Sequence, residues 1–356
     1  MSKRNRRMNL LYVPALALVL IFVLVPLIRS IQTSFYNWNG YSPVKTFIGF
    51  QNYLDLMKDE NFKMSFCNTV LYGFGSTILQ NVIGLALALF LNTKFAGHKA
   101  VRTIVYLPVM ISGLIMGYIM YFVVQNNGAI NEILGWFGME GADWMASGAV
   151  GRIFITLINS WQFCGICMVL YMAGLQNISR MYYEAAAIDG AKSFECFRYI
   201  TLPLLIPAMS SAFIINLIGG LKLYDVVVSL SGGGPGFETS SLSFYIDNRY
   251  FKAEKAGYAS AVGVIMFIFI LICSMLLNKY FARRRLRCDE QGKEEQIQGR
   301  RAALLCRPEE GVLVEVSSCF PGSRSLYDSI VCTGSAVLQR NLRYVQCTGD
   351  AGGIQA

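Results

Sequence analysis

The sequence predicts an all-α polytopic membrane protein with six transmembrane helices and both termini in the cytoplasm. Three observations predict this fold class. First, 54% of the 356 residues are hydrophobic and only 15% are charged, whereas a soluble domain carries about 25% charged residues. Second, six stretches reach the roughly 20 apolar residues that a membrane-spanning helix needs. Third, the basic residues gather in alternate connections, as they do on the cytoplasmic side of membrane proteins.

The six apolar stretches are separated by polar connections of unequal length. The first stretch follows a short basic segment, and its apolar run continues through Pro26 to Arg29. This length favours a retained helix over a cleaved signal peptide. The predicted spans are Leu10–Ile31, Asn68–Leu91, Thr103–Val124, Val150–Gly174, Leu204–Leu221 and Tyr258–Lys279.

Charge asymmetry predicts the orientation of these spans. Four basic residues precede the first span, three lie between the second and third spans without an acid, and four arginines follow the sixth. The connection 125–149 carries three acids and no base. We therefore expect a cytoplasmic N-terminus over residues 1–9, a transmembrane domain over residues 10–287 and a cytoplasmic tail over residues 288–356.

The tail changes character at Cys288. It shows no sustained helical or strand periodicity and holds five of the ten cysteines, without paired spacing. We interpret it as a disordered or poorly packed appendage left by a reading-frame slip; a small regulatory domain is the alternative. Because His98 is the sole histidine and the cysteines lack zinc or redox spacing, no metal site is predicted.

The connection 177–203, on the predicted cytoplasmic side, is charged, kinked and partly helical. A short helix is expected to stop at Asp189-Gly190, where glycine favours the left-handed capping conformation. A second short helix, capped by Ser193, leads into the fifth span, which Pro207 should bend. An amphipathic helix resting on the membrane surface is the alternative interpretation of this pattern.

Seven residues of this connection match a longer motif. They follow the spacing E-A-A-x3-G-x9-I-x-L-P, on Glu184, Ala185, Ala186, Gly190, Ile200, Leu202 and Pro203. This pattern resembles the cytoplasmic loop of the membrane subunits of binding-protein-dependent ABC importers, and more closely the sugar permeases of the maltose and glycerol-phosphate type. The segments SFYNWNG, RTIVYLPVMIS, LYMAGLQNIS and VVSLSGGGPG are similar to that family as well. The resemblance covers roughly residues 9–285.

The resemblance implies a multi-pass permease subunit of the cell membrane that carries a carbohydrate, with a coupling helix that docks on a separate ATPase. The chain has no G-x4-G-K-[ST] phosphate loop, so ATP and Mg²⁺ are expected on that partner and no cofactor on this chain. The expected partners are a second related permease, two ATPase copies, an external substrate-binding protein and lipid, without nucleic acid. The implied coupling residues are Glu184, Ala185, Ala186, Asp189, Gly190, Ile200, Leu202 and Pro203.

Polar side chains inside membrane spans are costly and tend to line a pathway. Counted from Glu184, the sugar-contacting positions of the resembling family fall on eight residues of the fourth and fifth spans, and Tyr224 beside them could cover an apolar sugar face. Several of the eight are glycine or apolar where the maltose permease has polar residues. Helix-packing contacts are the alternative role. The candidate path residues are Asn159, Gln162, Phe163, Ile166, Asn216, Gly219, Gly220, Leu223 and Tyr224.

Three external features complete the expectations. Gly233, Gly234 and Pro235 form a tight turn that, by the resemblance, faces the substrate-delivering protein. Lys222 and Asp225 lie three apart on a helix, where they would neutralise each other; if Asp225 instead faces away, Lys222 could meet an anionic substrate such as a sugar phosphate. The region Gln32–Cys67 is expected to be a compact cap whose aromatic residues serve packing.

Two other function classes compete with an importer permease. A secondary transporter or channel driven by an ion gradient would need intramembrane carboxylates or an internal repeat, and the deep spans have no Asp or Glu. A membrane-embedded enzyme would need a nucleophile–base set, and the histidine lies on a predicted cytoplasmic connection.

Overall fold

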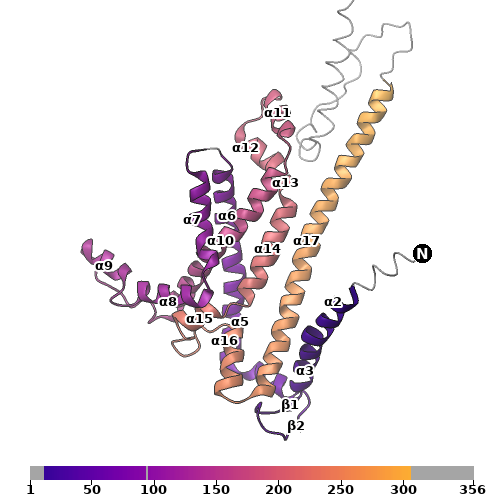
Figure 1. Ribbon diagram of the computed structural model, residues 1–356. Coiled ribbons are helices and arrows are strands. Elements are labelled where there is room, and N and C mark those ends of the chain that lie inside the picture. Colours follow the sequence, from indigo (N-terminus) through magenta and orange to yellow (C-terminus); the bar gives the residue numbers. More distant parts are fainter. Residues whose placement is uncertain (1–11, 94, 306–356) are drawn as a thin grey trace, which may run out of the picture. The chain divides into compact units, whose positions relative to one another are not determined.

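The computed structural model describes residues 12–93 and 95–305, and these ranges are mainly helical (Figure 1). Within them, two short strands, β1 (Tyr36–Asn37) and β2 (Thr46–Phe47), pair antiparallel. The chain forms two compact units. The first contains the described parts of residues 1–82, 103–165 and 215–275, and the second those of residues 83–102, 166–214 and 276–356.

Between four and six segments of the described chain are long and apolar enough to cross a bilayer. Four are unbroken helical runs, and two are pairs of helices that reach the required length only together because each pair is sharply bent. Each of the six predicted stretches overlaps one of them. The unbroken runs are Leu16–Thr33, Glu60–Asn92, Gly148–Gln176 and Ala256–Arg284.

The first candidate span leads into the predicted cap. It consists of α2 (Tyr12–Val19), the π-helical segment η1 (Leu20–Leu24) and α3 (Val25–Thr33). None of its membrane-length window is buried by the rest of the chain. A helix this apolar and this uncovered requires lipid or another protein around it.

The cap is compact, as predicted, and most of its aromatic residues serve packing. The ring of Phe35 packs against Phe50 and Tyr53, with centroids 5.2 Å and 5.8 Å apart. The Nδ2 of Asn52, on α4 (Gln51–Lys58), donates to the carbonyls of Ser34 and Tyr36. Three aromatic side chains of the cap are nonetheless largely exposed, Tyr41 by 67% and Phe47 and Phe50 by 68% each.

The second candidate span is one continuous run made of α5 (Glu60–Val70), η2 (Leu71–Gly75) and α6 (Ser76–Asn92). Asp59 caps its start, because its carboxylate accepts from the backbone N–H groups of Asn61 and Phe62. At about 1.5 Å per residue, this run exceeds the apolar thickness of a bilayer. Its first turns are therefore expected to stand outside the hydrocarbon core.

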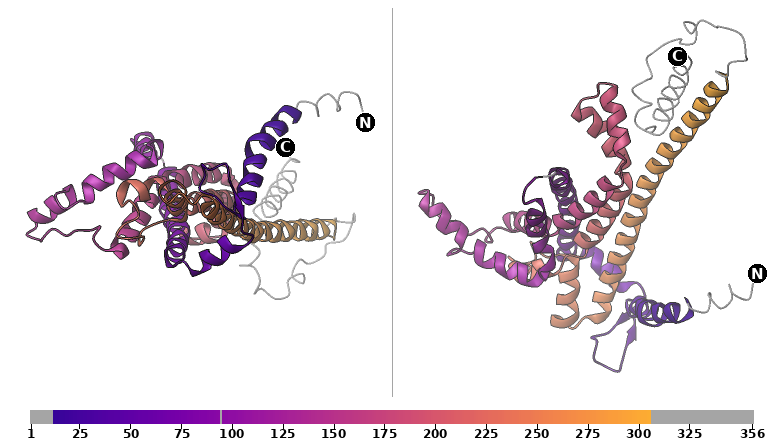
Figure 2. Two further views of the ribbon diagram at one scale, coloured as in Figure 1. Left: turned by 90° about the horizontal axis from the view of Figure 1, so that it is seen from below. Right: turned by 45° about the horizontal axis from the view of Figure 1, so that its top comes forward.

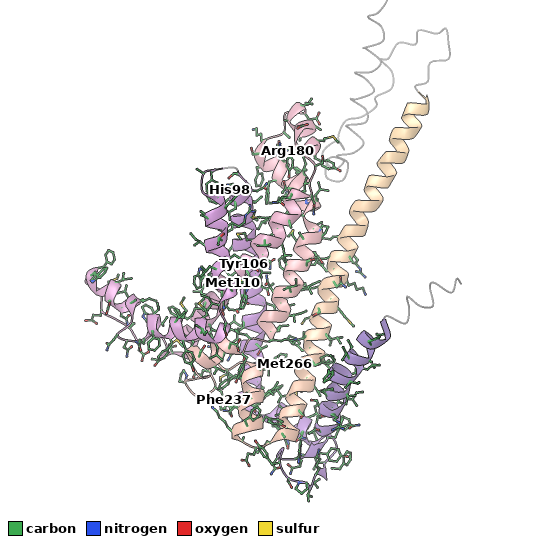
Figure 3. All side chains as sticks on the ribbon, viewed as in Figure 1. His98, Tyr106, Met110, Arg180, Phe237 and Met266 are labelled. Atoms are coloured by element: carbon green, nitrogen blue, oxygen red, sulfur yellow. The ribbon has the colours of Figure 1, made fainter. Side chains whose placement is uncertain are left out.

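The third predicted span, Thr103–Val124, is divided in the structure. α7 (His98–Met110) and α8 (Gly113–Val124) are separated at Ile111 and Ser112, and the segment from α8 through α9 (Ala129–Trp136) is bent by 99° from α7. Pro108 in the last turn of α7 has no N–H to donate, and Ser112 has an extended backbone with ψ 138°. His98 and Met110 mark the two ends of α7 in Figure 3.

The core of the first unit joins segments that are far apart in the sequence. α8 lies against α15 (Asp225–Leu230), where Gly117 lets the backbones approach closely. The side chains of Tyr72, Met116, Ile155, Ile158, Leu223, Val226, Val227, Leu230 and Phe244 form one buried cluster there.

The fifth predicted span, Leu204–Leu221, has a bend at its start: the helical run Ser193–Leu204 meets α14 (Ile206–Leu221) at 66°, with the break at Leu205. The sequence predicted a bend from Pro207, and it emerges in the preceding turn because the proline ring clashes with the carbonyl four residues earlier and cannot donate to it. The fourth span is the unbroken helix α10 (Gly148–Gln176). It is followed along the chain by α11 (Arg180–Ile188), α12 (Ser193–Cys196), η3 (Phe197–Thr201), α13 (Leu202–Leu204) and α14 (Ile206–Leu221).

The last elements are α16 (Leu242–Asp247), η4 (Asn248–Lys252) and α17 (Ala256–Leu305). α17 is a continuous helix in every view (Figures 1 and 2). Over residues 288–305 the structure thus differs from the tail predicted to lack regular structure. These residues are rich in Glu, Gln, Arg and Ala, which favour helix through intrinsic propensity even without apolar periodicity. Residues 1–9 and 306–356 lie outside the described residues, and the frame slip stays a prediction.

Two adjacent glycines of α14 face different surroundings. A Cβ on Gly220 would lie 3.0 Å from Gly73 Cα and 3.2 Å from the carbonyl oxygen of Tyr72, whereas a Cβ on Gly219 would meet nothing within 4 Å. Gly220 thus allows α14 to pack closely on the second span.

We expect Gly220→Ala to lower the thermal unfolding midpoint and Gly219→Ala to raise it or leave it unchanged. Both changes gain about 1 kcal/mol of helix propensity, and Gly220→Ala alone adds an overpacking cost of about 1–3 kcal/mol. Thermal unfolding of the two purified variants in detergent measures the difference. Equal shifts for both variants would contradict this packing.

Candidate functional site

The predicted coupling connection folds as a hairpin of two short helical legs in the second unit. The first leg is α11, whose N-cap residue Ser179 accepts from the N–H of Met181. The second leg is α12, η3 and α13. Arg180, at the start of α11, and His98 lie toward the same end of the second unit (Figure 3).

The first leg ends at Asp189-Gly190, as predicted. Gly190 has φ +78°, a left-handed conformation that strains other residues. Its N–H donates to the carbonyl of Ala187, and the N–H of Ala191 donates to that of Ala186 at 2.9 Å. These two bonds make a Schellman motif. The chain therefore reverses at a fixed angle after α11.

The second leg starts differently from the prediction. Ser193 is the first residue of α12 and not its cap; instead, the N–H of Lys192 donates to Glu195 Oε2 at 2.8 Å. Glu195 can reach back in this way because it stands three residues after the cap position, as in a capping box. The two legs are joined by a hydrogen bond between the Tyr183 hydroxyl and Thr201 Oγ1, 2.9 Å apart.

The hairpin divides the predicted coupling residues between two faces. Ala186 and Ile200 are buried, and Ala185, Leu202 and Pro203 are half-buried. Glu184, Asp189 and Gly190 are exposed.

Two large apolar side chains that the motif did not include lie on the exposed surface of the hairpin. Ile188 is 77% exposed and Phe194 is 70% exposed. Met181, Glu184 and Ile188 share one face of α11 because they are three and four residues apart. Met181 and Ile188 are about two helical turns apart, and this spacing in the sequence could have indicated an apolar face on α11.

The fourth span carries the first group of candidate path residues. Asn159 and Gln162 on α10 are buried, while Phe163 and Ile166 are half-buried. Gln162 Nε2 donates to the carbonyl of Ile111 at 3.1 Å, which is the break between α7 and α8. Its Oε1 is buried without a hydrogen-bond partner in the described part of the chain. The Nε2 of Gln162 therefore stabilises the break between α7 and α8, while its Oε1 remains available to accept a hydrogen bond.

Sequence reasoning missed a second glutamine beside this group. Gln80, on α6, is buried and donates from Nε2 to the carbonyl of Asn159 at 3.0 Å. Its Oε1 also lacks a partner among the described residues. An amide in the middle of the second predicted span was the available signal, since a polar side chain there is costly unless it has a role.

The candidate residues of the fifth span do not share one environment. Asn216 is buried and Gly219 is exposed, while Gly220 contacts the second span. Leu223 belongs to the buried apolar cluster, and Tyr224 packs against it. Partial burial, the charge of Asp247 and a hydrogen bond to it raise the pKa of Tyr224, so its hydroxyl stays protonated at neutral pH.

The predicted pairing of Lys222 with Asp225 on one helix is wrong. α14 ends at Leu221 and Asp225 begins α15, so a turn separates them. Among the described residues the ion pairs are Lys63–Glu60 and Arg249–Asp59. Asp225 instead lies beside Gly113, the first residue of α8, where a helix N-terminus favours a carboxylate.

The glycine-rich segment Ser231–Phe237 is a tight turn, as expected. Gly232, Gly233 and Gly236 have positive φ angles of 57°, 81° and 58°. Gly233 is buried against the ring of Phe244, whereas Pro235 is exposed. Of the three predicted contact residues, Pro235 is the most accessible.

The sequence matches a known family and several of its curated members. Residues 80–287 match the family described as binding-protein-dependent transport system inner membrane component. The chain is 34% identical to the probable starch degradation products transport system permease protein AmyD of Thermoanaerobacterium thermosulfurigenes, over 76% of this chain and 92% of that one. It is 32% identical to the trehalose/maltose transport system permease protein MalF of Thermococcus litoralis, over 78% and 94%.

The fold matches solved structures as well. A chain of a bacterial ABC transporter involved in the import of the acidic polysaccharide alginate superposes with a TM-score of 0.69 and 26% identity, covering 79% of this chain and 96% of that one. The same score and identity hold for a crystal structure of a bacterial alginate ABC transporter in complex with a periplasmic protein bound to an alginate pentasaccharide.

Proposed function

Because this chain belongs to the family of binding-protein-dependent transport system inner membrane components, we propose that it is the permease subunit of an ATP-driven importer for a carbohydrate. The observation that carries the proposal is the rigid helical hairpin after α10, with an exposed face of Met181, Glu184 and Ile188. The names of the relatives, which include starch degradation products, trehalose/maltose and lactose, support a sugar as the cargo.

The proposed topology has six spans with both termini in the cytoplasm. In this arrangement α7 and α8 together form the third span, and the fifth span is mainly α14, because the helical run Ser193–Leu204 that is bent from α14 belongs to the cytoplasmic hairpin. The basic connections then face the cytoplasm, as charge asymmetry favours. His98 and Arg180 lie toward the same end of the second unit (Figure 3). This supports the proposal that the two connections that contain them lie on the same side of the membrane.

The hairpin is the proposed docking element for a separate ATPase, which would bind ATP and Mg²⁺ while this chain binds no cofactor and catalyses no reaction. Exposed Ile188 and Phe194 supply apolar contact area, and Glu184 can pair with a partner cation. The Schellman turn and the bond between Tyr183 and Thr201 keep the two legs together. A rigid element passes on a rigid-body movement that a loose linker would absorb.

The proposed sugar path runs beside Asn159, Gln162 and Asn216, with Gln80 added. The two glutamines hold buried carbonyl oxygens without partners in the described residues, and a sugar hydroxyl can donate to such an oxygen. Leu223 and Gly220 contribute through packing in this proposal, because both touch other parts of the protein.

The proposed assembly contains a second permease subunit, two ATPase copies and an external substrate-binding protein. The uncovered first span offers a surface to lipid or to the second permease. The alginate transporter crystallised with a periplasmic protein supports the external partner. An ion-gradient-driven transporter is the second candidate, and the absence of Asp and Glu from the six predicted spans disfavours it.

The first test concerns coupling. We expect Gly190→Glu to abolish ATP-dependent sugar uptake, and Glu184→Lys to weaken co-purification of the ATPase by reversing a charge at the contact. The matched control is Gly97→Glu, since Gly97 also has a positive φ of 89° and open space around it but lies on another connection. Both glycine changes cost about 1–2 kcal/mol of backbone strain. If Gly190→Glu loses uptake and Gly97→Glu does not, the loss is therefore due to impaired docking of the ATPase and not to strain. Full uptake by both hairpin variants would refute the assignment.

The second test concerns topology. A reporter fused after Arg285 should be cytoplasmic, and Gly234→Cys in a cysteine-free background should react with an impermeant maleimide in intact cells. The physical reason is the bias of basic residues toward the cytoplasm. Labelling of Gly234→Cys only after permeabilisation would overturn the six-span arrangement.

The third test concerns the path. Asn159→Leu, Gln162→Leu and Asn216→Leu should each reduce uptake per assembled complex several-fold, because each lost hydrogen bond contributes about 1 kcal/mol. Phe163→Ala should also reduce it through lost stacking. Trp161→Ala is the control, since Trp161 is on the same helix but exposed.

Uptake of a radiolabelled sugar, chosen from maltose, trehalose and lactose by a first screen, measures this effect. If the residues serve helix packing alone, the amount of complex or its thermal midpoint falls and uptake per complex stays constant. That result across all four variants would place the path elsewhere.

A further inference from the structure

The first turns of the second candidate span present a row of buried polar side chains to a loop that follows the fifth. Asn68 and Thr69, on α5, each lie three or four residues from Ser65 before them and from Tyr72 after them, and all four side chains are at most 1% exposed. Their partners are in the segment 238–242, immediately after the glycine-rich turn. We call these four side chains and their bonds to that segment the polar seam.

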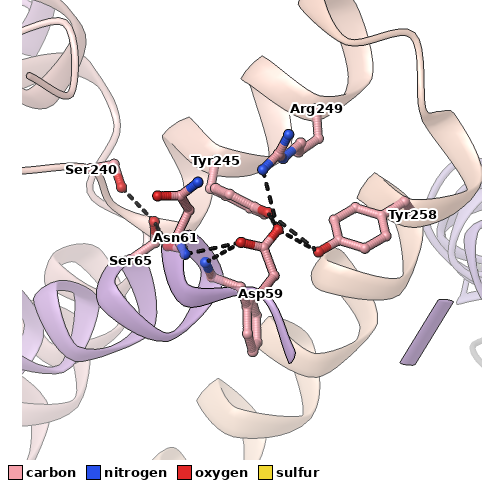
Figure 4. Close-up of polar contacts among 8 residues, drawn as sticks. Asp59, Asn61, Ser65, Ser240, Tyr245, Arg249 and Tyr258 are labelled. Carbon is pink, nitrogen blue, oxygen red and sulfur yellow. Dashed lines mark hydrogen bonds and ion pairs between the residues drawn. The ribbon is translucent and has the colours of Figure 1, made fainter. Parts of the chain in front are cut away.

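The polar seam forms hydrogen bonds with four of the five residues of the segment 238–242. Asn68 Nδ2 donates to the carbonyls of Glu238 and Ser240, at 2.7 Å and 3.0 Å. The Tyr72 hydroxyl donates to the carbonyl of Thr239 at 2.9 Å, and Thr69 Oγ1 accepts from the N–H of Leu242 at 2.8 Å. A hydrogen bond also joins the hydroxyls of Ser65 and Ser240 (Figure 4). A buried irregular segment needs such bonds because its backbone groups have neither helix nor water partners.

Asp59 extends this attachment to α16, η4 and α17. Its Oδ2 accepts from the hydroxyls of Tyr245 and Tyr258, at 2.5 Å and 2.9 Å, and from Arg249 Nη2 at 3.2 Å (Figure 4). Its Oδ1 caps α5. One carboxylate therefore fixes the start of the second span to the elements that follow the seam.

This carboxylate stays ionised throughout the neutral range. Partial burial raises the pKa of Asp59, but hydrogen bonds from Tyr245, Tyr258 and Asn61 and the charge of Arg249 outweigh burial, so the net pKa lies below the usual 3.8. A depressed pKa gives stability that is present above 3.8 and is lost as the pH falls through the folded-state value. The attachment is thus constant at physiological pH and does not act as a pH switch there.

Thr239 connects the polar seam to the glycine-rich turn. Its carbonyl accepts from Tyr72, while its Oγ1 lies 2.8 Å from both Ser231 Oγ and the carbonyl oxygen of Gly234 and can donate its single proton to either. Gly233 rests against the ring of Phe244 in α16. The conformation of the turn thus depends on contacts that begin on the second span.

We propose that Asn68 and Tyr72 are positioning residues for substrate delivery. Through the polar seam they hold the turn Ser231–Phe237 in one conformation, so that the external binding protein meets a preformed surface. The inference rests on the proposed function of this turn as the contact with that protein. A preformed loop binds more tightly because its ordering entropy is not lost on association.

The test uses the assembled complex with its ATPase and second permease in lipid nanodiscs. Tyr72→Phe keeps the ring and removes one hydrogen bond. Asn68→Ala removes the bonds to Glu238 and Ser240 together with the long hydrogen bond that Asn68 Oδ1 accepts from Arg152 Nη1 at 3.4 Å. Ser243→Ala is the matched control, since its hydroxyl lies on α16 and, among the described residues, makes one weak hydrogen bond, to Met266 Sδ at 3.9 Å. Hydrogen–deuterium exchange of the peptide containing residues 231–240 is measured without the binding protein.

We expect both seam variants to speed exchange in this peptide by about three- to tenfold, as loss of hydrogen bonds of typical strength predicts, and the control to leave it unchanged. The concentration of purified cognate binding protein that half-maximally stimulates ATP hydrolysis should rise several-fold, while the rate at saturation stays the same. If these residues had a purely structural role, the variants would lower the amount of assembled complex or the saturating rate of ATP hydrolysis, and would not raise the half-maximal concentration alone.

A third variant separates the two proposals. Pro235→Arg places a bulky charge on the exposed tip of the turn and should raise the half-maximal concentration if the turn is the contact. If Pro235→Arg has this effect and the seam variants change neither exchange nor half-maximal concentration, the positioning role is refuted and the contact stands. If Pro235→Arg has no effect, the proposed contact fails, and the positioning role with it.

Discussion

Within a bilayer, a backbone N–H or carbonyl that leaves a regular helix has no water to bond, and each unsatisfied group costs several kcal/mol. The fold of this chain depends on how it meets that constraint, because two of its candidate spans are broken. At the break between α7 and α8, the amide of Gln162 donates to the free carbonyl of Ile111. Where the second span is expected to extend beyond the hydrocarbon core, burial within the protein imposes the same need: Asn68 and Tyr72 donate to backbone carbonyls of an irregular buried segment, and Thr69 accepts from the N–H of Leu242.

The same constraint explains why structural and transport roles of a polar side chain need not exclude each other. Gln162 and Gln80 each commit their Nε2 to a backbone carbonyl and keep a buried Oε1 without a partner in the described residues. An uncommitted acceptor in a protein interior is unfavourable unless something bonds to it. A polyhydroxylated cargo passing between spans offers such bonds, so the amides can fix the helices and still serve a path.

The predicted coupling hairpin meets a different requirement, since it must be stiff while lying outside the main packing of the spans. Local interactions supply most of the stiffness: a Ser179 cap, a Schellman turn at Gly190 and the reach of Glu195 back to Lys192. One longer-range bond, between Tyr183 and Thr201, ties the legs together. The large apolar side chains Ile188 and Phe194 are left on the surface, where a partner can cover them.

The sequence by itself determined the features that depend on short-range physics. Apolar length located the membrane segments, and Asp189-Gly190 located the end of α11, because helix length and left-handed glycine caps are local properties. Only the tertiary structure decided which polar residues meet. Asp59 lies far in sequence from Tyr245, Arg249 and Tyr258, and Gln162 from Ile111. The direction of α8 and the separate surroundings of Gly219 and Gly220 likewise follow from the packing of distant segments, which periodicity along one chain does not encode.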